Sequence, residues 1–383
     1  MSALQNLRST ITAQTTRLAA LLPRDDWLVI GGVFAIKIML MIFGVRSYHM
    51  LEDEPLPPHL GWLGIWNRWD ALHFQRLAQA GYNSTDIMKA WFYPLYPWCV
   101  RLTAYLTRDF LISAFVVSAV ASVIAAVILR RMTGLDFSAN VARRAVWFFL
   151  IFPTAYVLHI GYTESLFLAL TFGSIFAARR ERWWLAGVLG AFSWMTRANG
   201  IVLLPTLAVE AAYQFWKGRR WNWQWLWIGV VPAGFGVYLW LNWRVAGDPF
   251  AFLKMRQQLF HMSFSWPWVG IRGAIGNLHR NPNEAEIVGG EELFATLLAL
   301  GCAIVSWIKL RPSYATWISC NWILVASVTF IESMPRYALT MFPIFILFGL
   351  LGKSRFWSAV ITVWSILLLA IFSSLFIRGW WVF

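Results

Sequence analysis

The sequence contains few of the charged residues that a soluble protein needs on its surface. Charged residues make up 13% of its 383 residues, whereas a soluble protein usually carries about a quarter. This deficit excludes a chain of soluble globular domains, because too few polar side chains are available to cover them. Three cysteines are present, and Cys302 and Cys320 fall within apolar runs, so no disulfide framework is indicated.

Nucleotide-binding motifs are also missing from the sequence. It contains neither a Walker sequence nor a plausible glycine-rich Rossmann loop, so it shows no cytosolic nucleotide site.

Apolar residues are abundant and form long runs. Hydrophobic residues make up 59% of the chain, which also contains 26 tryptophans, and tryptophan favours the membrane–water boundary. The net charge of +14 is explained by basic cytoplasmic loops, without a nucleic-acid partner. Because backbone groups in hydrocarbon must be satisfied internally, we interpret these runs as helices. The sequence therefore predicts an all-α polytopic membrane protein, with residues 1–383 as a single integral-membrane domain.

The apolar runs predict about eleven spans, several of them shorter than the ~20 residues of a full crossing. They lie at about 27–45, 110–130, 144–158, 164–178, 183–197, 200–216, 223–245, 292–308, 313–331, 337–352 and 356–377. The short pair around Thr196–Gly200 is typical of half-helices that meet inside a protein.

The distribution of basic residues predicts the orientation. With the N-terminus in the cytoplasm, the short inner connections hold most of the arginines and lysines, as the positive-inside rule requires. The C-terminus and two long segments, 46–109 and 246–291, then lie outside the cytoplasm. Within the first of these segments, Tyr93–Leu106 is predicted to be an interfacial or re-entrant helix. Because most carboxylates fall on the outer side, we expect any chemistry to face outward.

The first outer segment carries a candidate catalytic carboxylate, Asp70, in the motif Trp66-Asn-Arg-Trp-Asp-Ala-Leu-His73. If the following residues are helical, Asp70 and His73 share a face. Asp70 then has two interpretations that the sequence does not separate. It could be only the N-cap of a membrane-lying helix, or it could take a proton from an incoming hydroxyl group.

Three further polar groups lie at membrane depth, where such groups are functional candidates by default. Glu164 opens a span, a position where an acid also suits the helix N-terminus. Arg197 interrupts two short apolar helices, and Arg336 precedes another span, where it could instead pair with Glu332 or reach the headgroups. Arginines at these positions suit a phosphate-leaving reaction, because a guanidinium can grip phosphate oxygens. Six neighbouring side chains are candidates for substrate contact: Trp69, His73, Tyr93, Tyr162, Asn199 and Tyr337.

These motifs together resemble the GPI mannosyltransferase 2 family, specifically its bacterial relatives. The resemblance spans about residues 60 to 350, in the right order, through WNRWDALHFQRLAQAGY, WFYPLYP, GYTESLF, TRANG, GDPFAF with SWPW, and SMPRYALTMFPIF. It implies the GT-C glycosyltransferase fold, with an essential acid in the first large outer loop and a bacterial cytoplasmic membrane location. It also implies a polyprenyl-phosphate-mannose donor and transfer with inversion to an α-mannoside. The acceptor is expected to be a glycan, a glycolipid or a protein.

The resemblance assigns provisional roles to the candidate residues. Asp70 matches the first-loop acid and Glu164 the place of a second acid, so both are expected to be catalytic. Arg197 and Arg336 match basic positions, and we interpret them as contacts to the donor phosphate. Asp70, His73 and Glu164 could together form a divalent metal site, as in some GT-C enzymes, but we expect no metal or other cofactor.

Two other functions are compatible with a membrane protein of this composition. A lipid-linked-sugar flippase or transporter would be expected to show internal pseudosymmetry and binding residues near the bilayer midplane. The sequence has no matching halves, and its polar clusters concentrate on one side. A non-catalytic subunit of a glycosyltransferase complex is the second alternative, and the presence of Asp70 and Glu164 argues only mildly against it.

Overall fold

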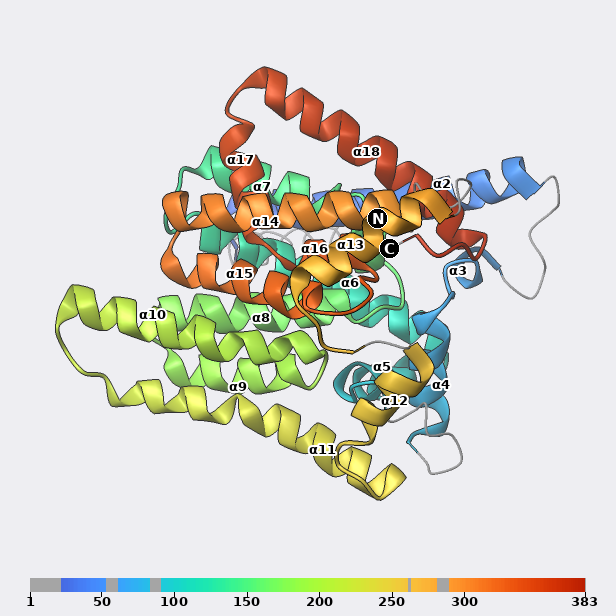
Figure 1. Cartoon of the computed structure of the whole chain (residues 1–383). Coiled ribbons are helices and arrows are strands. Elements are labelled where there is room, and N and C mark those ends of the chain that lie inside the picture. The colour runs from blue at the N-terminus through green and yellow to red at the C-terminus, as the bar shows by residue number, and fades with distance from the viewer. Residues whose placement is uncertain (1–21, 53–60, 83–90, 261–262, 281–288, 383) are drawn as a thin grey trace, which may run out of the picture.

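The protein is almost entirely helical, as predicted. The computed structural model describes residues 22–52, 61–82, 91–260, 263–280 and 289–382 (Figure 1). Within these ranges the one β feature is an isolated antiparallel bridge between Phe264 and Val328. The helices are α2 (Arg24–Glu52), α3 (Gly61–Gly64), α4 (Asp70–Ala80), α5 (Leu95–Thr107), α6 (Phe110–Thr133), α7 (Ala139–Leu150), α8 (Glu164–Arg179), α9 (Trp183–Trp194), α10 (Leu203–Gly218), α11 (Pro232–Ala246), α12 (Ala251–Phe260), α13 (Pro267–Arg280), α14 (Glu291–Lys309), α15 (Pro312–Ala326), α16 (Met334–Thr340), α17 (Pro343–Leu351) and α18 (Arg355–Ile377), with the short 3₁₀ segments η2 (Ala155–Leu158), η3 (Ala198–Val202) and η4 (Trp223–Val230).

The chain is an integral membrane protein, but the predicted count of about eleven spans is not confirmed. In the described part of the chain, five helices are long and apolar enough to cross a membrane: α2, α6, η4 with α11, α14 and α18. The bent pair of α16 and α17 would make a sixth. Helices do occupy the other predicted spans, but α8 and α10 have only 16 residues each and α9 has 12.

Proline accounts for two differences from the predicted spans. The span expected at 144–158 ends as a helix at Leu150, and η2 follows only after the break around Pro153. The span expected at 337–352 is divided into α16 and α17, which are bent by 80° at the residues before Pro343. Proline lacks an N–H group and disfavours the α conformation in the residue before it, so each apolar run becomes two elements.

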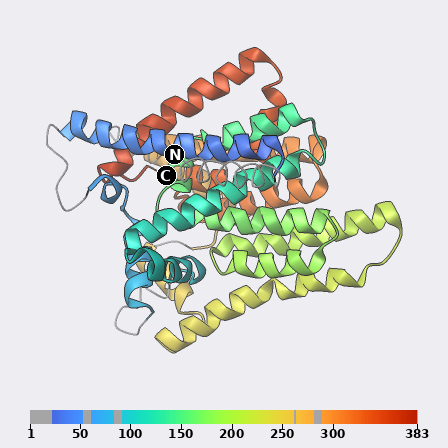
Figure 2. The same ribbon diagram turned by 180° about the vertical axis from the view of Figure 1, so that it is seen from behind.

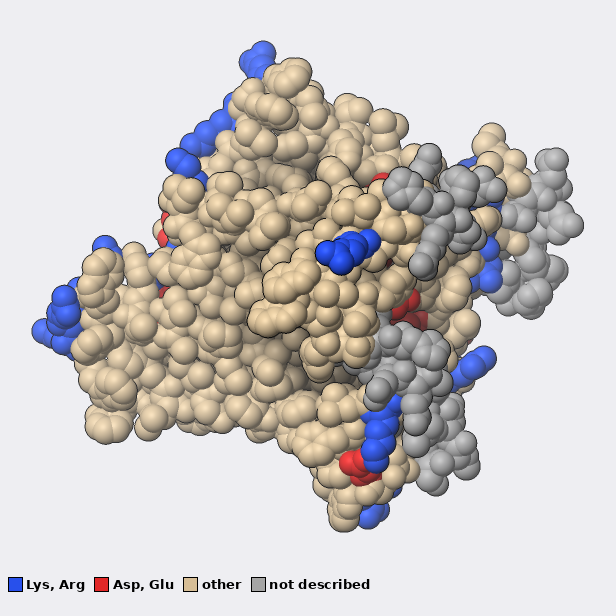
Figure 3. Space-filling view, viewed as in Figure 1, with Lys and Arg blue, Asp and Glu red and all other residues tan. Residues whose placement is uncertain are grey.

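The helices form a bundle whose two ends differ in chemistry. Figures 1 and 2 show α8, α9, α10, α14 and α15 running alongside one another, with α2 and α18 on the opposite side of the bundle from α11. Figure 3 shows Lys and Arg at the end where α10 terminates and where α17 meets α18, and further Lys and Arg at the opposite end, near α12. The opposite end carries α3, α4, α5 and α12 (Figure 1), so helices occupy the described parts of both long segments predicted to lie outside.

Buried ion pairs join helices at the end of the bundle where α10 terminates and where α17 meets α18, which we call the arginine-rich end. The Asp26 carboxylate is fully buried and accepts hydrogen bonds from Arg130 Nε at 2.7 Å and Arg131 Nε at 2.9 Å, which ties α2 to α6. Glu210 on α10 is also buried and receives Arg311 Nε at 2.8 Å and Nη2 at 2.6 Å, which ties α10 to the start of α15. Several basic residues of the predicted cytoplasmic connections therefore stabilise the packing of the helices.

The second long segment folds back against the chain that leads into α16. Ser265 N donates to Ser327 O at 3.1 Å and Thr329 N donates to Ser263 O at 3.0 Å. Just beyond, a Cβ at Gly270 would lie 2.8 Å from Val328 O, so α13 packs closely there only because this residue is glycine. These contacts fix the segment between α15 and α16, and the candidate residue Arg336 follows it as the third residue of α16.

Candidate active site

The first-loop carboxylate lies at the start of an amphipathic helix. α4 buries Phe74 and Leu77 on one face, and this apolar packing fixes the helix. Asp70 is the first residue of α4, and the N-cap position is occupied by Trp69, whose φ is positive at 53° and whose side chain makes no capping hydrogen bond. The interpretation of Asp70 as an N-cap is therefore wrong. Its side chain, 29% exposed, instead forms an ion pair with Arg336, whose Nη1 lies 2.7 Å from Asp70 Oδ2.

Glu164 lies behind this pair as the common partner of two arginines. Its side chain is fully buried at the start of α8, and Oε1 accepts hydrogen bonds from Arg197 Nη1 and Arg336 Nε. Arg197 Nη1 also donates to Thr163 Oγ1 at 2.9 Å. A buried carboxylate is costly unless it is paired, and here one carboxylate brings two guanidinium groups together.

Each of the two guanidinium groups also lies over an aromatic ring. Arg336 lies over the ring of Tyr162 at 4.6 Å from its centre, and Arg197 lies 5.3 Å from the centre of the Tyr337 ring. Such cation–π contacts are attractive, more so when desolvated. The cluster of Asp70, Glu164, Arg197 and Arg336 carries two charges of each sign, so it is balanced as it stands. We call these four residues the charge cluster.

The TRANG motif positions Arg197 at a tight junction between two helices. α9 ends at Trp194 and η3 begins at Ala198, so Arg197 lies in extended backbone between them. A Cβ at Gly200 would lie 2.3 Å from the Trp194 Cα atom, which leaves room only for glycine. Next to it, Asn199 Nδ2 donates to Asn321 Oδ1 at 2.7 Å and joins η3 to α15. The two predicted short helices are thus present as α9 and α10, and the tight turn between them presents an arginine.

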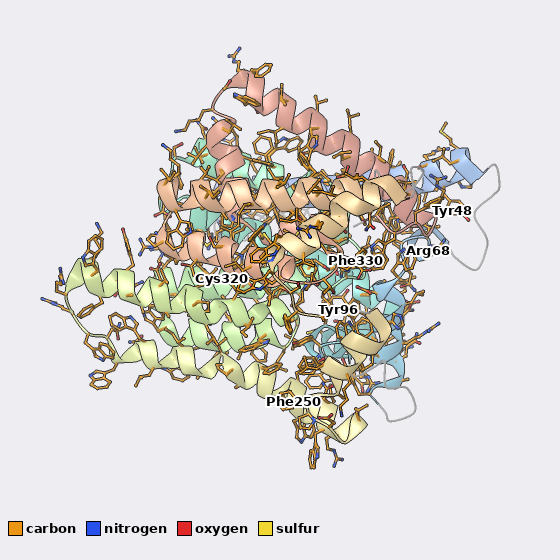
Figure 4. The ribbon with its side chains drawn as sticks, viewed as in Figure 1. Tyr48, Arg68, Tyr96, Phe250, Cys320 and Phe330 are labelled. Atoms are coloured by element: carbon orange, nitrogen blue, oxygen red, sulfur yellow. The ribbon has the colours of Figure 1, made fainter. Side chains whose placement is uncertain are left out.

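A cavity of about 390 Å³ opens beside the charge cluster, within the roughly 300–1,000 Å³ of small-molecule sites. Six of the predicted site residues line it: Asp70, Tyr93, Arg197, Asn199, Arg336 and Tyr337. Most of the remaining wall is apolar or aromatic. In Figure 4, Tyr96 on α5 and Phe330 before α16 lie in the middle part of the molecule, away from the arginine-rich end.

Four of the predicted site residues do not line this cavity. Glu164 and Tyr162 are fully buried behind the arginines, and the Tyr162 hydroxyl donates to the Arg68 carbonyl at 3.2 Å. His73 stacks on Phe92, with ring centres 5.0 Å apart. Trp69 packs edge-on against Trp381 and donates from Nε1 to the Trp380 carbonyl at 3.3 Å. These residues support the cavity wall or the loops around it.

Several residues that line the cavity were not predicted from the sequence. Tyr238 on α11 stacks on Tyr93 with ring centres 3.9 Å apart, and Phe252, from the GDPFAF motif, packs against Tyr238 at 5.4 Å between ring centres. Both line the cavity, as do Trp194 and Thr163. The motifs GDPFAF and GYTESLF marked Phe252 and Thr163, whereas Tyr238 lies in an apolar run with no local signal.

Two ionisable groups near the cavity have shifted pKa values. Burial raises the pKa of the Tyr93 hydroxyl above its usual value, so this group stays protonated and able to donate a hydrogen bond. Burial, and then the negative charge of Asp70, raise the pKa of Glu332. The segment before α16 thus brings a second carboxyl group close enough to Asp70 for the two charges to interact.

The residues considered for a metal site do not fit one. Among the described residues, no three His, Cys, Asp or Glu side chains converge as metal ligands would. Glu164 binds two arginines instead, and the Arg336 guanidinium next to Asp70 would repel a divalent cation. His73 is turned toward Phe92.

Comparison with known proteins agrees with the resemblance in the sequence. Residues 61–220 match the family described as "Mannosyltransferase (PIG-V)". The chain is 33% identical over 155 residues to GPI alpha-1,6-mannosyltransferase 2 of Mus musculus, covering 38% of this chain and 31% of the relative. It is 30% identical over 142 residues to GPI mannosyltransferase 2 of Schizosaccharomyces pombe, covering 36% and 30%. The chain thus spans about a third of the length of these relatives. An oligosaccharyltransferase of Archaeoglobus fulgidus, solved with a tethered acceptor peptide, aligns with a TM-score of 0.47 at 11% identity, over 89% of this chain and 55% of that one.

Proposed function

We propose that this chain is a membrane mannosyltransferase acting in the cavity beside the charge cluster. The match of residues 61–220 to the mannosyltransferase family and the similarity to GPI alpha-1,6-mannosyltransferase 2 over 155 residues support this proposal. The observation that supports this most directly is the meeting of Asp70 and two arginines at one cavity wall. Asp70 comes from the first long loop, and the arginines come from segments more than a hundred residues later. A merely structural ion pair would not need a cavity of ligand size beside it.

The proposed donor is mannose carried on a polyprenyl phosphate. Such a molecule has a polar head with one phosphate and a long apolar tail. The cavity offers two cationic side chains for the phosphate, Arg197 and Arg336, and apolar or aromatic walls that include Phe235 and Phe252. Arginine suits this role because its planar guanidinium can donate two hydrogen bonds to one phosphate. The acceptor class remains as expected from the resemblance: a hydroxyl group on a glycan, a glycolipid or a protein.

The proposed reaction is a single displacement. Asp70 accepts the proton of the acceptor hydroxyl as its oxygen attacks the anomeric carbon of mannose. The bond from that carbon to the phosphate oxygen breaks on the opposite side, and its electron pair leaves with the lipid phosphate. A β-linked donor then gives an α-mannoside, with a protonated Asp70 and polyprenyl phosphate as the other products. Arg197 and Arg336 stabilise the charge that develops on the departing phosphate.

Glu164 takes a different role in this proposal from the one expected of a catalytic acid. It is fully buried and outside the cavity lining, so it would not touch the acceptor. Both guanidinium groups donate hydrogen bonds to Glu164 Oε1, so this one carboxylate holds them next to each other. We therefore assign it the positioning of Arg197 and Arg336, supported by Thr163. Preorganised charges of this kind cost little rearrangement during the reaction.

The site is proposed to open on the extracytoplasmic face. Under the positive-inside rule, the arginine-rich end of the bundle lies in the cytoplasm. Figures 1 and 3 show that α4 and α12, which flank the cavity, lie at the other end. A donor lipid in the outer leaflet could then reach the cavity without a soluble carrier.

The test is transfer of mannose by the purified, reconstituted chain. Synthetic polyprenyl-phosphate-mannose is supplied with a panel of glycan, glycolipid and peptide acceptors, and the mannosylated product and its anomeric configuration are determined. An α-mannoside formed in stoichiometric ratio with polyprenyl phosphate is expected. Movement of the lipid-sugar between leaflets without a new glycosidic bond would instead assign a transporter. Turnover that requires a second protein subunit would assign a non-catalytic partner role.

A further inference from the structure

One buried carboxylate outside the cavity lining has no role in the proposed reaction. Glu292, the second residue of α14, is 5% exposed. Its oxygens accept hydrogen bonds from two successive backbone groups, Ser333 N and Met334 N, each at 2.7 Å. Among the described residues, no lysine or arginine forms an ion pair with it. Because an unpaired buried carboxylate is expensive, its place at this backbone calls for an explanation.

The backbone that Glu292 holds is the start of α16. Ser333 adopts a left-handed conformation with φ of 62° and ψ of 25°, which is strained for a residue other than glycine. The next residues are Met334 and Pro335, and proline has no N–H to offer. A helix start leaves its first N–H groups without partners inside the helix. Glu292 accepts hydrogen bonds from the N–H groups of Ser333 and Met334.

A second buried side chain holds the next residue of the same backbone. Thr154 lies between α7 and η2 and is fully buried, and its Oγ1 donates to the Pro335 carbonyl at 3.0 Å. The three consecutive residues before Arg336 are therefore fixed by two side chains, Glu292 of α14 and Thr154 of the connection between α7 and η2. Arg336 follows at once and reaches both Asp70 and Glu164.

We propose that Glu292 is a positioning residue that holds the Arg336 guanidinium in the charge cluster by clamping the backbone of Ser333 and Met334. This inference rests on the proposed function, because Arg336 is taken to contact the donor phosphate. Displacing a catalytic group by about 1 Å can cost on the order of 100-fold in rate. A clamp that sets the backbone two residues before the guanidinium therefore controls how well the phosphate is held.

The substitution Glu292→Gln tests the clamp with little change in volume. A carboxylate offers an acceptor oxygen to each N–H, whereas an amide offers one oxygen and presents its own NH₂ group to the other donor. We expect kcat/KM for the donor to fall about tenfold, which corresponds to about 1.4 kcal/mol. The KM for the acceptor should change less than about twofold. Glu291→Gln, at the neighbouring acid on the same helix turn, is the matched control and should behave as wild type.

A double-mutant cycle separates this role from general destabilisation. If Glu292 acts through Arg336, its substitution in an Arg336→Lys background should cost less than about twofold, because the geometry it maintains is already lost. The same tenfold loss in both backgrounds would overturn the inference, and so would wild-type kinetics in a folded Glu292→Gln protein. If that variant does not fold, Thr154→Val takes its place in the same cycle, because it releases only the Pro335 carbonyl.

A separate measurement distinguishes failure of the clamp from failure of the proposed function. A wild-type protein that transfers no mannose would refute the function. The clamp would then be judged by the heat stabilisation that polyprenyl phosphate confers on the purified protein. Smaller stabilisation in both Glu292→Gln and Arg336→Lys than in wild type would support it, and equal stabilisation in wild type and Glu292→Gln would overturn it.

Discussion

Replacement of Asp70 by asparagine removes the proposed base and leaves the shape of the site unchanged. Loss of a general base costs roughly 10²–10⁴-fold in rate. We therefore expect kcat to fall at least ~100-fold, a rise in the activation barrier of about 2.7 kcal/mol. The loss should appear in kcat. The KM for the donor should not rise, because asparagine competes less with the donor phosphate for Arg336 Nη1.

Loss of structure would not account for such an effect. The Asp70 side chain is 29% exposed, and Arg336 keeps its ion pair with Glu164 when Asp70 is neutralised. Arg336 is therefore not left unpaired in the interior, the situation that costs about 3–5 kcal/mol. The thermal unfolding of Asp70→Asn in detergent should therefore stay close to that of wild type.

The assay measures mannose release from synthetic polyprenyl-phosphate-mannose at several donor concentrations, with purified wild type and variant side by side. Asp109→Asn is the control from the same loop. Asp109 caps α6 by accepting the Ile112 N–H at 2.8 Å, and asparagine caps a helix equally well, so this variant should retain full activity. Turnover near the wild-type rate in Asp70→Asn would refute its assignment as the base.

Three further substitutions test other parts of the structure. Arg197→Lys should raise the KM for the donor about tenfold, because a lysine cannot grip a phosphate bidentately; an unchanged KM in steady-state kinetics would contradict the phosphate assignment. Glu332→Gln tests a carboxyl group whose folded-state pKa is raised by burial and by a neighbouring carboxylate. Wild type therefore loses folded-state stability as the pH rises above 4.5, the ordinary pKa of glutamate, because Glu332 is then harder to ionise in the folded than in the unfolded state. The variant should gain stability relative to wild type with increasing pH in thermal melts from pH 4 to 8. A stability difference that does not change with pH would count against the raised pKa. Glu210→Gln leaves Arg311 without its buried partner and should lower the free energy of unfolding by about 3 kcal/mol, measured by denaturant titration, with little effect on donor KM.

The helices were predictable from the sequence to a considerable extent, and the reason is physical. In a membrane, an apolar run has few alternatives to a helix, and each predicted span contains one in the structure. Helix length and the number of crossings were less accessible. Pro153 and Pro343 divide runs that look continuous in composition, and helices such as α9 are too short to cross by themselves. The composition of a run indicates only that its surroundings are apolar, and these can be lipid or the interior of the protein.

The members of the charge cluster were also predictable, because arginine and glutamate at membrane depth are too costly to be accidental. Their partners were not. Asp70 and Arg336 are 266 residues apart in the chain, and no local pattern indicates that one meets the other. Glu292 shows the same limit more sharply. At the first turn of an apolar helix it reads as an acid suited to the helix N-terminus, and only the fold brings it to the backbone of Ser333.

The charge cluster links donor binding to the proposed base through a single guanidinium. Arg336 uses Nε for Glu164 and Nη1 for Asp70. Glu164 is buried and cannot leave, whereas Asp70 lies at the cavity wall and is partly exposed. A phosphate that binds Arg336 would compete with Asp70, the more exposed of its two partners, and would free that carboxylate to accept a proton. In this mechanism the donor itself prepares the base, which explains why a catalytic carboxylate would be paired with the arginine that binds the leaving group.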